Sequence, residues 1–248
     1  MKSKIIRRNE IMAGHSQYAN IKHRKDAQDN KRGKVFQKLS REIYVAVKLS
    51  GEKVESNPRL KLLLEKARRI NMPKDNINRA INKATNKNET THYDAITYEG
   101  FGPSNVAIIV HCLTDNKNRT ASNIRSYFNK AGGQFNAVQY LFQTTGVIEF
   151  NSVLTTDEIL EMVIDLEIFN IEKNDNVILI TLKPQQLAVS TSALEKNGIN
   201  EFITNDIRNI PSDFVTIDDK QQEKVLMNLF DAIEDDDDVL DIEHNFQK

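Results

Sequence analysis

Cysteine is nearly absent from this 248-residue chain, and long apolar runs are absent altogether. The one cysteine, Cys112, excludes an internal disulfide and a four-cysteine zinc site. No stretch approaches the roughly 18 to 20 unbroken apolar residues that a membrane-spanning helix needs. The basic segment Met1–Arg8 lacks the apolar core of a secretory signal. These absences predict a soluble, cytoplasmic protein with no membrane partner.

Motifs of metal binding and catalysis are also missing. The histidines show no metal-ligand spacing, and the sequence has no P-loop, nucleophile elbow or Ser-His-Asp pattern. The segment 100–103 (Gly-Phe-Gly-Pro) lacks the third glycine of a phosphate-binding loop and is typical of a turn between strands. We expect Cys112, beside His111 in a predicted strand, to be packed rather than reactive. The chain is therefore predicted to be no enzyme and to carry no metal and no cofactor.

Charge is distributed unevenly along the chain, although the formal net charge is only −1. Residues 1–85 hold 22 Lys and Arg against 8 Asp and Glu, a net charge of +14. Residues 86–248 hold 12 against 27, a net charge of −15. This asymmetry is typical of a basic module carried by an acidic body. The alternative is that the two halves neutralise each other in the folded protein.

The basic part is predicted to be a small helical bundle. A helix over 34–48 places its apolar residues on one face and its basic residues on the opposite face. Asn57 and Pro58 are typical of the start of a second helix, and Pro73 opens a third.

Between Lys31 and Lys48 there are six basic residues and one acidic residue, Glu42, whereas solvated helix faces usually alternate in sign. Because phosphates attract Lys and Arg, this pattern predicts contact with nucleic acid. The residues predicted to make that contact are Lys22, His23, Arg24, Lys25, Lys31, Arg32, Lys34, Lys38, Arg41 and Lys48.

After a polar linker at 86–91, the sequence pattern changes to that of an α/β protein. Strands are predicted at 95–101 and 105–113, followed by a helix over 119–131 that Asn118 caps. Two short strands are expected next, at 138–143 and 146–150.

The region that starts with the strand 146–150 predicts the order β-α-β-β-α-β, a ferredoxin-like arrangement. Thr155 and Glu158 form a capping box that opens a helix through Leu166. The elements expected after it are a hairpin of strands 168–173 and 177–182, a helix over 184–197 and a strand over 201–210.

A helix over 220–233 and a strand over 239–244 remain, and they need a sheet to join. We therefore predict an α+β multidomain fold, in which an N-terminal helical bundle precedes two ferredoxin-like α/β domains, one inserted in the other. The acidic segment Asp235–Asp238 lacks the pattern of a calcium loop, and we expect a solvated turn there. The expected domains are 1–90, 91–145 plus 215–248, and 146–214.

Several segments carry a family resemblance. The segment 12–34 contains Met-Ala-Gly-His-Ser, then Ala-Asn-Ile-Lys-His-Arg-Lys, and ends in Lys-Arg-Gly-Lys; Gly14, His15, Ser16 and Asn20 belong to this motif. Further motifs are Asn-Pro-Arg-Leu at 57–60, Asn-Met-Pro-Lys-Asp-Asn-Ile at 71–77 and Tyr-Glu-Gly-Phe-Gly-Pro at 98–103. Together they closely resemble the YebC/PmpR family, which includes the mitochondrial translational activator of cytochrome c oxidase.

The resemblance covers nearly the whole chain after Met12 and implies three domains, the last inserted in the second. It also implies a non-catalytic role in gene expression. Members are described both as DNA-binding transcriptional regulators and as ribosome-associated translation factors that relieve stalling, notably at proline-rich stretches. Two departures from the family are the segment 1–11, which precedes the usual start, and Gln17-Tyr18, where many members have Lys-Trp.

Two functions follow, and both have nucleic acid as the partner. One is a DNA-binding transcriptional regulator, although no helix shows an obvious base-reading series. The other is a translation factor that binds ribosomal RNA and the ribosome, since folded RNA is recognised largely through its shape and backbone. An enzyme such as a nuclease is the least supported alternative. The sequence does not indicate the oligomeric state.

Overall fold

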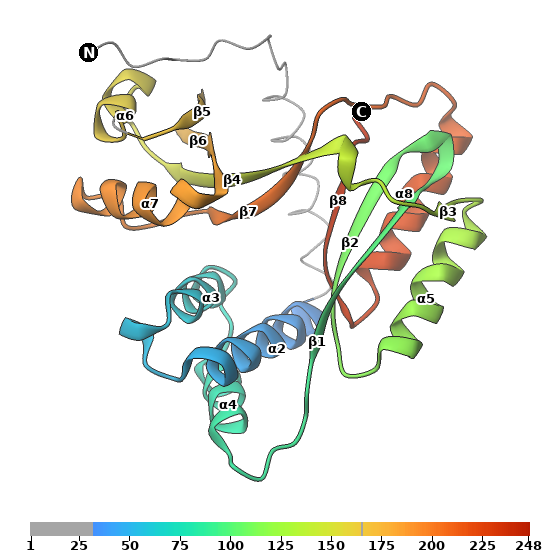
Figure 1. The fold of residues 1–248 in the computed structure, drawn as a ribbon, viewed down its shortest axis with the longest axis horizontal. Helices are drawn as coiled ribbons and strands as arrows, with labels where there is room; N and C mark the ends of the chain where they lie inside the picture. Colours follow the sequence, from blue (N-terminus) through green and yellow to red (C-terminus); the bar gives the residue numbers. More distant parts are fainter. Residues whose placement is uncertain (1–31, 165) are drawn as a thin grey trace. The chain divides into compact units, whose positions relative to one another are not determined.

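The computed structural model describes residues 32–164 and 166–248 (Figure 1). They form an α+β fold with two four-stranded antiparallel sheets. The described residues divide into two compact units, one over 141–212 and the other made of 32–140 together with 213–248. Within the described residues, no helix combines the length and apolar character needed to span a membrane.

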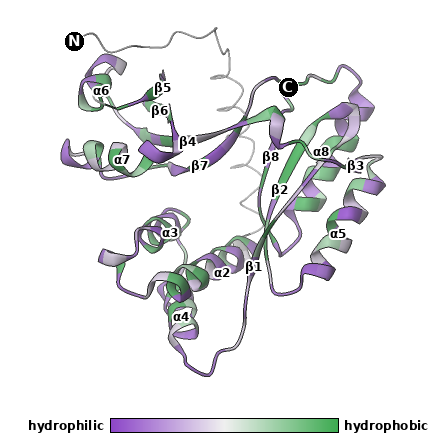
Figure 2. Cartoon of the chain, viewed as in Figure 1, coloured by the Kyte–Doolittle hydropathy of each residue, from purple (hydrophilic) through white to green (hydrophobic). Residues whose placement is uncertain are grey.

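The described residues of the basic part, 32–85, are mainly helical, as the sequence predicts. They form α2 (Arg32–Ser50), the 3₁₀ turn η2 (Val54–Ser56), α3 (Pro58–Arg69) and α4 (Lys74–Thr85). The apolar face of α2, including Leu39 and Ile43, is buried against Leu60 and Leu63 of α3 and Ala80 of α4. Each of these helices carries both hydrophobic and hydrophilic residues in Figure 2, as a helix that buries one face must.

Asn57 joins α2 to α3 and confirms the predicted helix start. Its side-chain oxygen accepts a hydrogen bond from the Leu60 amide at 3.0 Å, and Pro58 occupies the first turn of α3. Its amide nitrogen donates to the carbonyl oxygens of Ala46 and Gly51 at 2.9 and 2.7 Å. Asn57 is only 1% exposed, so one buried side chain fixes the end of α2 against the start of α3.

The first sheet belongs to the same unit as the helices and has the strand order β3-β1-β2-β8. Its helices α5 and α8 lie on one face, because Ile124 of α5 and Leu226 of α8 share a core with Ile108 and Val110 of β2 (Figure 1). The C-terminal strand returns to this sheet and pairs with β2. The elements are β1 (Asp94–Phe101), β2 (Ala107–Thr114), α5 (Lys117–Lys130), β3 (Gln134–Phe135), α8 (Lys220–Glu234) and β8 (Val239–His244).

The connectivity of this first sheet differs from the ferredoxin-like order. The consecutive strands β1 and β2 are direct neighbours, because the short 3₁₀ turn η3 (Pro103–Asn105) reverses the chain between them. A β-α-β-β-α-β order would need a helix between its first two strands. The expected resemblance therefore lies in the layers, two helices on one face of a four-stranded antiparallel sheet, and not in the path of the chain.

The second sheet has the order β5-β6-β4-β7, in which β6 separates the two strands that the first helix connects. This is the split β-α-β pattern. Its core contains Ile148, Phe150, Ile159, Ile180 and Leu194. The elements are β4 (Phe142–Asn151), α6 (Thr156–Met162), β5 (Ile168–Asn174), β6 (Val177–Leu182), the 3₁₀ turn η5 (Pro184–Gln186), α7 (Leu187–Lys196) and β7 (Thr204–Pro211).

Two predicted strands are one in the structure. The chain makes a 3₁₀ turn, η4 (Gln139–Leu141), and β4 then runs without interruption from Phe142. Residues Phe142–Glu149 of β4 pair with β7 without a break, and Gly146 is paired like its neighbours. The prediction of separate strands at 138–143 and 146–150 was therefore wrong.

Helix starts also differ from prediction in one case and agree in another. Asn116 caps α5, since its side chain accepts from the Arg119 amide at 3.1 Å, and the predicted cap, Asn118, lies inside the helix. At α6, both hydrogen bonds of the capping box between Thr155 and Glu158 are present. That helix ends at Met162 and does not reach the predicted Leu166.

Candidate nucleic-acid interface

Helix α2 has a covered basic face. Lys34, Lys38 and Arg41 lie opposite its apolar residues, yet all three are half-buried. The group that covers them is the acidic turn between α8 and β8, defined here as Glu234–Asp238.

Two lysines of α2 are bonded to the acidic turn. Lys34 Nζ lies 2.8 Å from Asp235 Oδ2 and donates to the carbonyl oxygen of the same residue at 2.9 Å. Lys38 Nζ donates to the Glu234 carbonyl oxygen at 2.6 Å. The hydrogen bond to Asp235 raises the pKa of Lys34, whereas burial lowers the pKa of Lys38.

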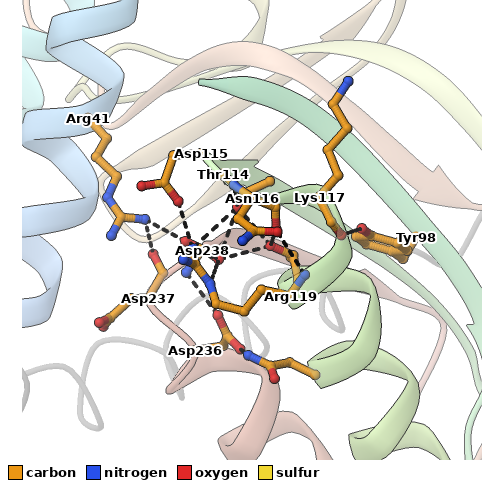
Figure 3. A network of polar contacts seen from close by, with 12 residues as sticks. Arg41, Tyr98, Thr114, Asp115, Asn116, Lys117, Arg119, Asp236, Asp237 and Asp238 are labelled. Carbon is orange, nitrogen blue, oxygen red and sulfur yellow. Dashed lines mark hydrogen bonds and ion pairs between the residues drawn. The ribbon is translucent and has the colours of Figure 1, made fainter. Parts of the chain in front are cut away.

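Asp238 is the centre of the contact (Figure 3). Its side chain is 3% exposed and accepts hydrogen bonds from two guanidinium groups, from Arg41 Nη1 at 2.9 Å and from Arg119 Nη2 at 2.6 Å. Thr114 and Thr120 donate their hydroxyls to the same carboxylate at 3.1 and 2.9 Å. Burial alone would raise the pKa of Asp238, but these hydrogen bonds outweigh it and hold the pKa below its ordinary value. Asp238 is therefore an ionised group that links α2, α5 and the end of β2.

Asp236 is the second buried carboxylate of the acidic turn and is 8% exposed. It accepts from Asn123 Nδ2 and from the Tyr127 hydroxyl of α5, each at 3.0 Å. Burial, together with the charge of Asp236, raises the pKa of Tyr127 to about 12. The tyrosine therefore remains a hydrogen-bond donor at neutral pH.

The expectation of a solvated turn at Asp235–Asp238 was wrong for Asp236 and Asp238, whereas Asp235 and Asp237 are exposed as expected. Asp236 and Asp238 are buried because their side chains have partners on α2, α5 and β2, which a sequence pattern does not reveal. Among the residues that the structure describes, no three His, Cys, Asp or Glu side chains gather closely enough to hold a metal ion.

Lys48 is exposed at the far end of α2. Its Nζ lies 5.7 Å from the centre of the Tyr44 ring and 3.4 Å from the Glu89 carbonyl oxygen. The Tyr44 hydroxyl donates to the Thr91 carbonyl at 2.7 Å, and the Tyr44 ring packs edge-on against Tyr93. The predicted linker at 86–91 thus contacts the helices.

The other predicted contact residues lie largely outside the described residues. Arg32 is the first residue of α2. The residues outside are Lys22, His23, Arg24, Lys25 and Lys31 of the predicted interface and Gly14, His15, Ser16 and Asn20 of the family motif.

Helices α3 and α4, with residues 86 and 87 after α4, form a second basic surface. Residues 58–87 contain nine Lys and Arg against two acidic residues, Glu65 and Asp75. All nine basic side chains are exposed, while the inner faces of both helices are buried against α2. This α3–α4 surface consists of Arg59, Lys61, Lys66, Arg68, Arg69, Lys74, Arg79, Lys83 and Lys87.

These nine residues were not among the predicted contact residues, because they are spread over two helices and the segment after them and do not form a cluster in the sequence. The charge count of 58–87 alone, nine against two, was the signal that could have found them.

The turn between α3 and α4 is short and held by backbone hydrogen bonds. Asn71 has φ = 55°, in the left-handed region, and its amide donates to the Arg68 carbonyl. The Met72 amide donates to the Ala67 carbonyl at 2.9 Å. These two bonds form a Schellman motif, which ends α3 and lets α4 begin after Pro73. Two helices joined by a four-residue turn have the layout of helix-turn-helix motifs.

Comparison with known proteins confirms the family. The TACO1/YebC protein N-terminal domain matches residues 16–87, and the TACO1/YebC second and third domain matches residues 93–246. The chain therefore belongs to the TACO1/YebC family, as its motifs predict.

Individual relatives match over nearly their whole length. A probable transcriptional regulatory protein of Geobacillus thermodenitrificans is 44% identical over 243 residues, covering 96% of this chain and 98% of that protein. A protein of the same description from Enterococcus faecalis is 43% identical over 237 residues, covering 93% and 97%. The crystal structure of a conserved hypothetical protein from Aquifex aeolicus has a TM-score of 0.74 and 38% identity, covering 90% of this chain and 91% of that one.

Proposed function

We propose that the protein is a non-catalytic, nucleic-acid-binding regulator of gene expression in the cytoplasm. Its relatives are named probable transcriptional regulatory proteins, which favours DNA as the target. The alternative is a translation factor that binds ribosomal RNA on the ribosome and relieves stalling, for example at proline-rich stretches.

The α3–α4 surface carries this proposal. Its cations are exposed, whereas Lys34, Lys38 and Arg41 are bonded to the acidic turn. A phosphate backbone needs several exposed cations on one surface, and residues 58–87 offer nine exposed cations against two carboxylates. Two of the nine, Lys66 and Lys83, form ion pairs with Glu42 and Glu89. The α2 cations predicted from sequence stay candidates for contact, on the condition that nucleic acid replaces the acidic turn as their partner.

Helix α4 adds groups that suit base contact. Asn78, Arg79 and Asn82 are exposed on it. Arginine pairs with guanine and asparagine with adenine in the major groove of duplex DNA. Because α4 follows a short turn after α3, it corresponds in position to the recognition helix of a helix-turn-helix.

We assign different binding roles to the expected domains. We assign nucleic-acid contact to the basic helical domain, residues 1–90. The discontinuous α/β domain (91–145 plus 215–248) and the inserted domain (146–214) would present a surface to the polymerase or the ribosome. The acidic turn holds the first two of these domains together through α2.

Binding of the full chain to labelled nucleic acid tests the proposal. Fluorescence anisotropy with duplex DNA and with single-stranded RNA should show affinity that falls roughly 10³- to 10⁵-fold between 50 and 200 mM salt, if six to ten phosphates are contacted. The variant R59A/R68A/K74A/K87A removes four exposed cations and should reduce the slope of log affinity against log salt by about two to four. No binding of the native chain to either polymer at low salt would overturn the proposal.

The two targets are separated by sedimentation of cell lysate. A transcriptional regulator should remain at the top of the gradient and be recovered on specific duplex DNA. A translation factor should migrate with ribosomal particles, and ribonuclease or the R59A/R68A/K74A/K87A substitutions should release it.

A further inference from the structure

The α3–α4 surface contains an open hollow of about 450 Å³ beside the turn that joins the helices. This volume lies within the range of small-ligand sites, about 300 to 1,000 Å³. The hollow is lined by Leu64, Arg68, Asn71, Met72, Lys74 and Ile77.

The lining combines three kinds of group. Leu64 and Ile77 are half-buried and Met72 is buried, so the inner wall is apolar. Arg68 and Lys74 are exposed, and they stand on the two helices that border the hollow.

Asn71 supplies a polar side chain on a hydrogen-bonded turn. The Schellman motif holds its backbone at φ = 55°, and its exposed side chain lines the hollow. A carboxamide offers both a hydrogen-bond donor and an acceptor, which suits the edge of a nucleobase.

We propose that this hollow binds one unpaired nucleotide of a single-stranded nucleic acid. The base would lie against Leu64 and Ile77, its edge would face Asn71, and the flanking phosphates would pair with Arg68 and Lys74. A base within a duplex has its faces covered by its neighbours, so only an unstacked base can use an apolar wall.

This proposal rests on the proposed nucleic-acid binding, and because it requires an unpaired base it favours the RNA-binding alternative over contact of α4 with duplex DNA. Charge supports a nucleotide as the occupant, because the hollow has two cations and no carboxylate among its lining residues. An acidic peptide with an apolar side chain is the competing occupant, and binding of such a peptide to the native chain and to the R68A/K74A variant distinguishes it.

Full-length protein is titrated with a single-stranded RNA of about 12 nucleotides and with the same strand in a duplex. The variant R68A/K74A removes the two cations of the hollow. Its matched control, R59A/K87A, removes two exposed cations of the same surface that do not line the hollow. The proposal predicts that the single strand binds more tightly than the duplex, and that R68A/K74A weakens single-strand binding about tenfold more than R59A/K87A.

The variant N71G separates base contact from charge. Glycine adopts the left-handed conformation readily, so the turn is retained while the amide is lost. We expect N71G to weaken single-strand binding several-fold with an unchanged salt slope. RNA that contains 4-thiouridine should, on irradiation, become cross-linked to a peptide within residues 64–77.

Equal losses in the two double variants, or equal affinity for strand and duplex, would overturn the hollow as a nucleotide site while leaving nucleic-acid binding intact. If R68A/K74A lost affinity for an acidic, leucine-containing peptide that the native chain binds, and its RNA affinity were unchanged, the hollow would be assigned to a protein partner instead. Failure of the native chain to bind any nucleic acid would overturn both this inference and the proposed function.

Discussion

Arg41 and Asp238, 197 positions apart in the sequence, meet through a hydrogen-bonded ion pair of 2.9 Å. The contact joins the basic helix α2 to the end of the acidic turn. The two oppositely charged halves of the chain therefore neutralise each other in part, here and through the ion pairs Lys34–Asp235 and Lys83–Glu89. Lys34, Lys38 and Arg41 are half-buried and bonded to the acidic turn, whereas the nine cations of the α3–α4 surface are exposed to solvent.

Replacing Asp238 by Asn should destabilise the protein. Two arginines and two threonines donate to this buried carboxylate, and breaking such a set typically costs about 3 kcal/mol. Urea denaturation at neutral pH measures the loss. Asp237→Asn is the control: Asp237 is exposed, and the Arg41 bond uses its main-chain carbonyl, so we expect a change below about 0.5 kcal/mol. Similar losses in both variants would contradict the central position of Asp238.

Stability should depend on pH through Asp238. Its folded-state pKa is lower than its unfolded-state pKa, since four side chains donate hydrogen bonds to the ionised form. The carboxylate therefore stabilises the fold above the ordinary aspartate value of 3.8, and this contribution is lost as the pH falls through the folded-state pKa. The difference in unfolding free energy between the native chain and D238N should be largest near neutral pH and should shrink in acid. A constant difference would contradict the assignment.

Asn57 is expected to stabilise the helical bundle strongly. Its buried side chain caps α3 and donates to two carbonyls of the α2 end, so Asn57→Ala leaves buried polar groups without partners and should cost about 2 to 4 kcal/mol. Asn57→Asp keeps the cap acceptor but places a carboxylate against both carbonyls, and it should cost at least as much. Thermal unfolding followed by circular dichroism measures both. Ser56→Ala, which removes one exposed hydrogen bond, is the control and should have little effect.

The sequence predicted much of the local structure because local structure leaves periodic signals. The apolar stripe of α2, the start of α3 at Asn57 and the capping box at Thr155 all depend on residues a few positions apart. The misplaced cap of α5 shows the limit of such signals. Asn116 and Asn118 are both good caps, and the order of the chain alone does not choose between them.

The candidate site was harder to predict than the fold. The basic residues of α2 were recognised, but their partners in the acidic turn lie about 200 positions away, and no periodicity links the two segments. A carboxylate run is usually solvated, so burial of Asp236 and Asp238 required the positions of α5 and β2 to be known. Similarly, the hollow beside Asn71 depends on how α3 and α4 cross, which their separate patterns do not specify.

Gly100 of β1 has no room for a side chain. A Cβ there would lie 2.6 Å from the Gln134 carbonyl oxygen and 2.7 Å from Cε1 of Phe128, so β3 or α5 must move to accept it. We expect Gly100→Ala to lower the free energy of unfolding by about 1 to 3 kcal/mol, as overpacking does.

Gly33→Ala is the matched control for that substitution. A Cβ at Gly33 meets no atom within 4 Å, and the residue lies in the first turn of α2. Because alanine favours helix over glycine, this variant should be neutral or more stable by up to about 1 kcal/mol. Urea midpoints of the two variants, measured together, test the packing of β1 directly. Equal midpoints for both would mean that β3 and the Phe128 ring yield to a methyl group without cost, contrary to the close contacts around Gly100.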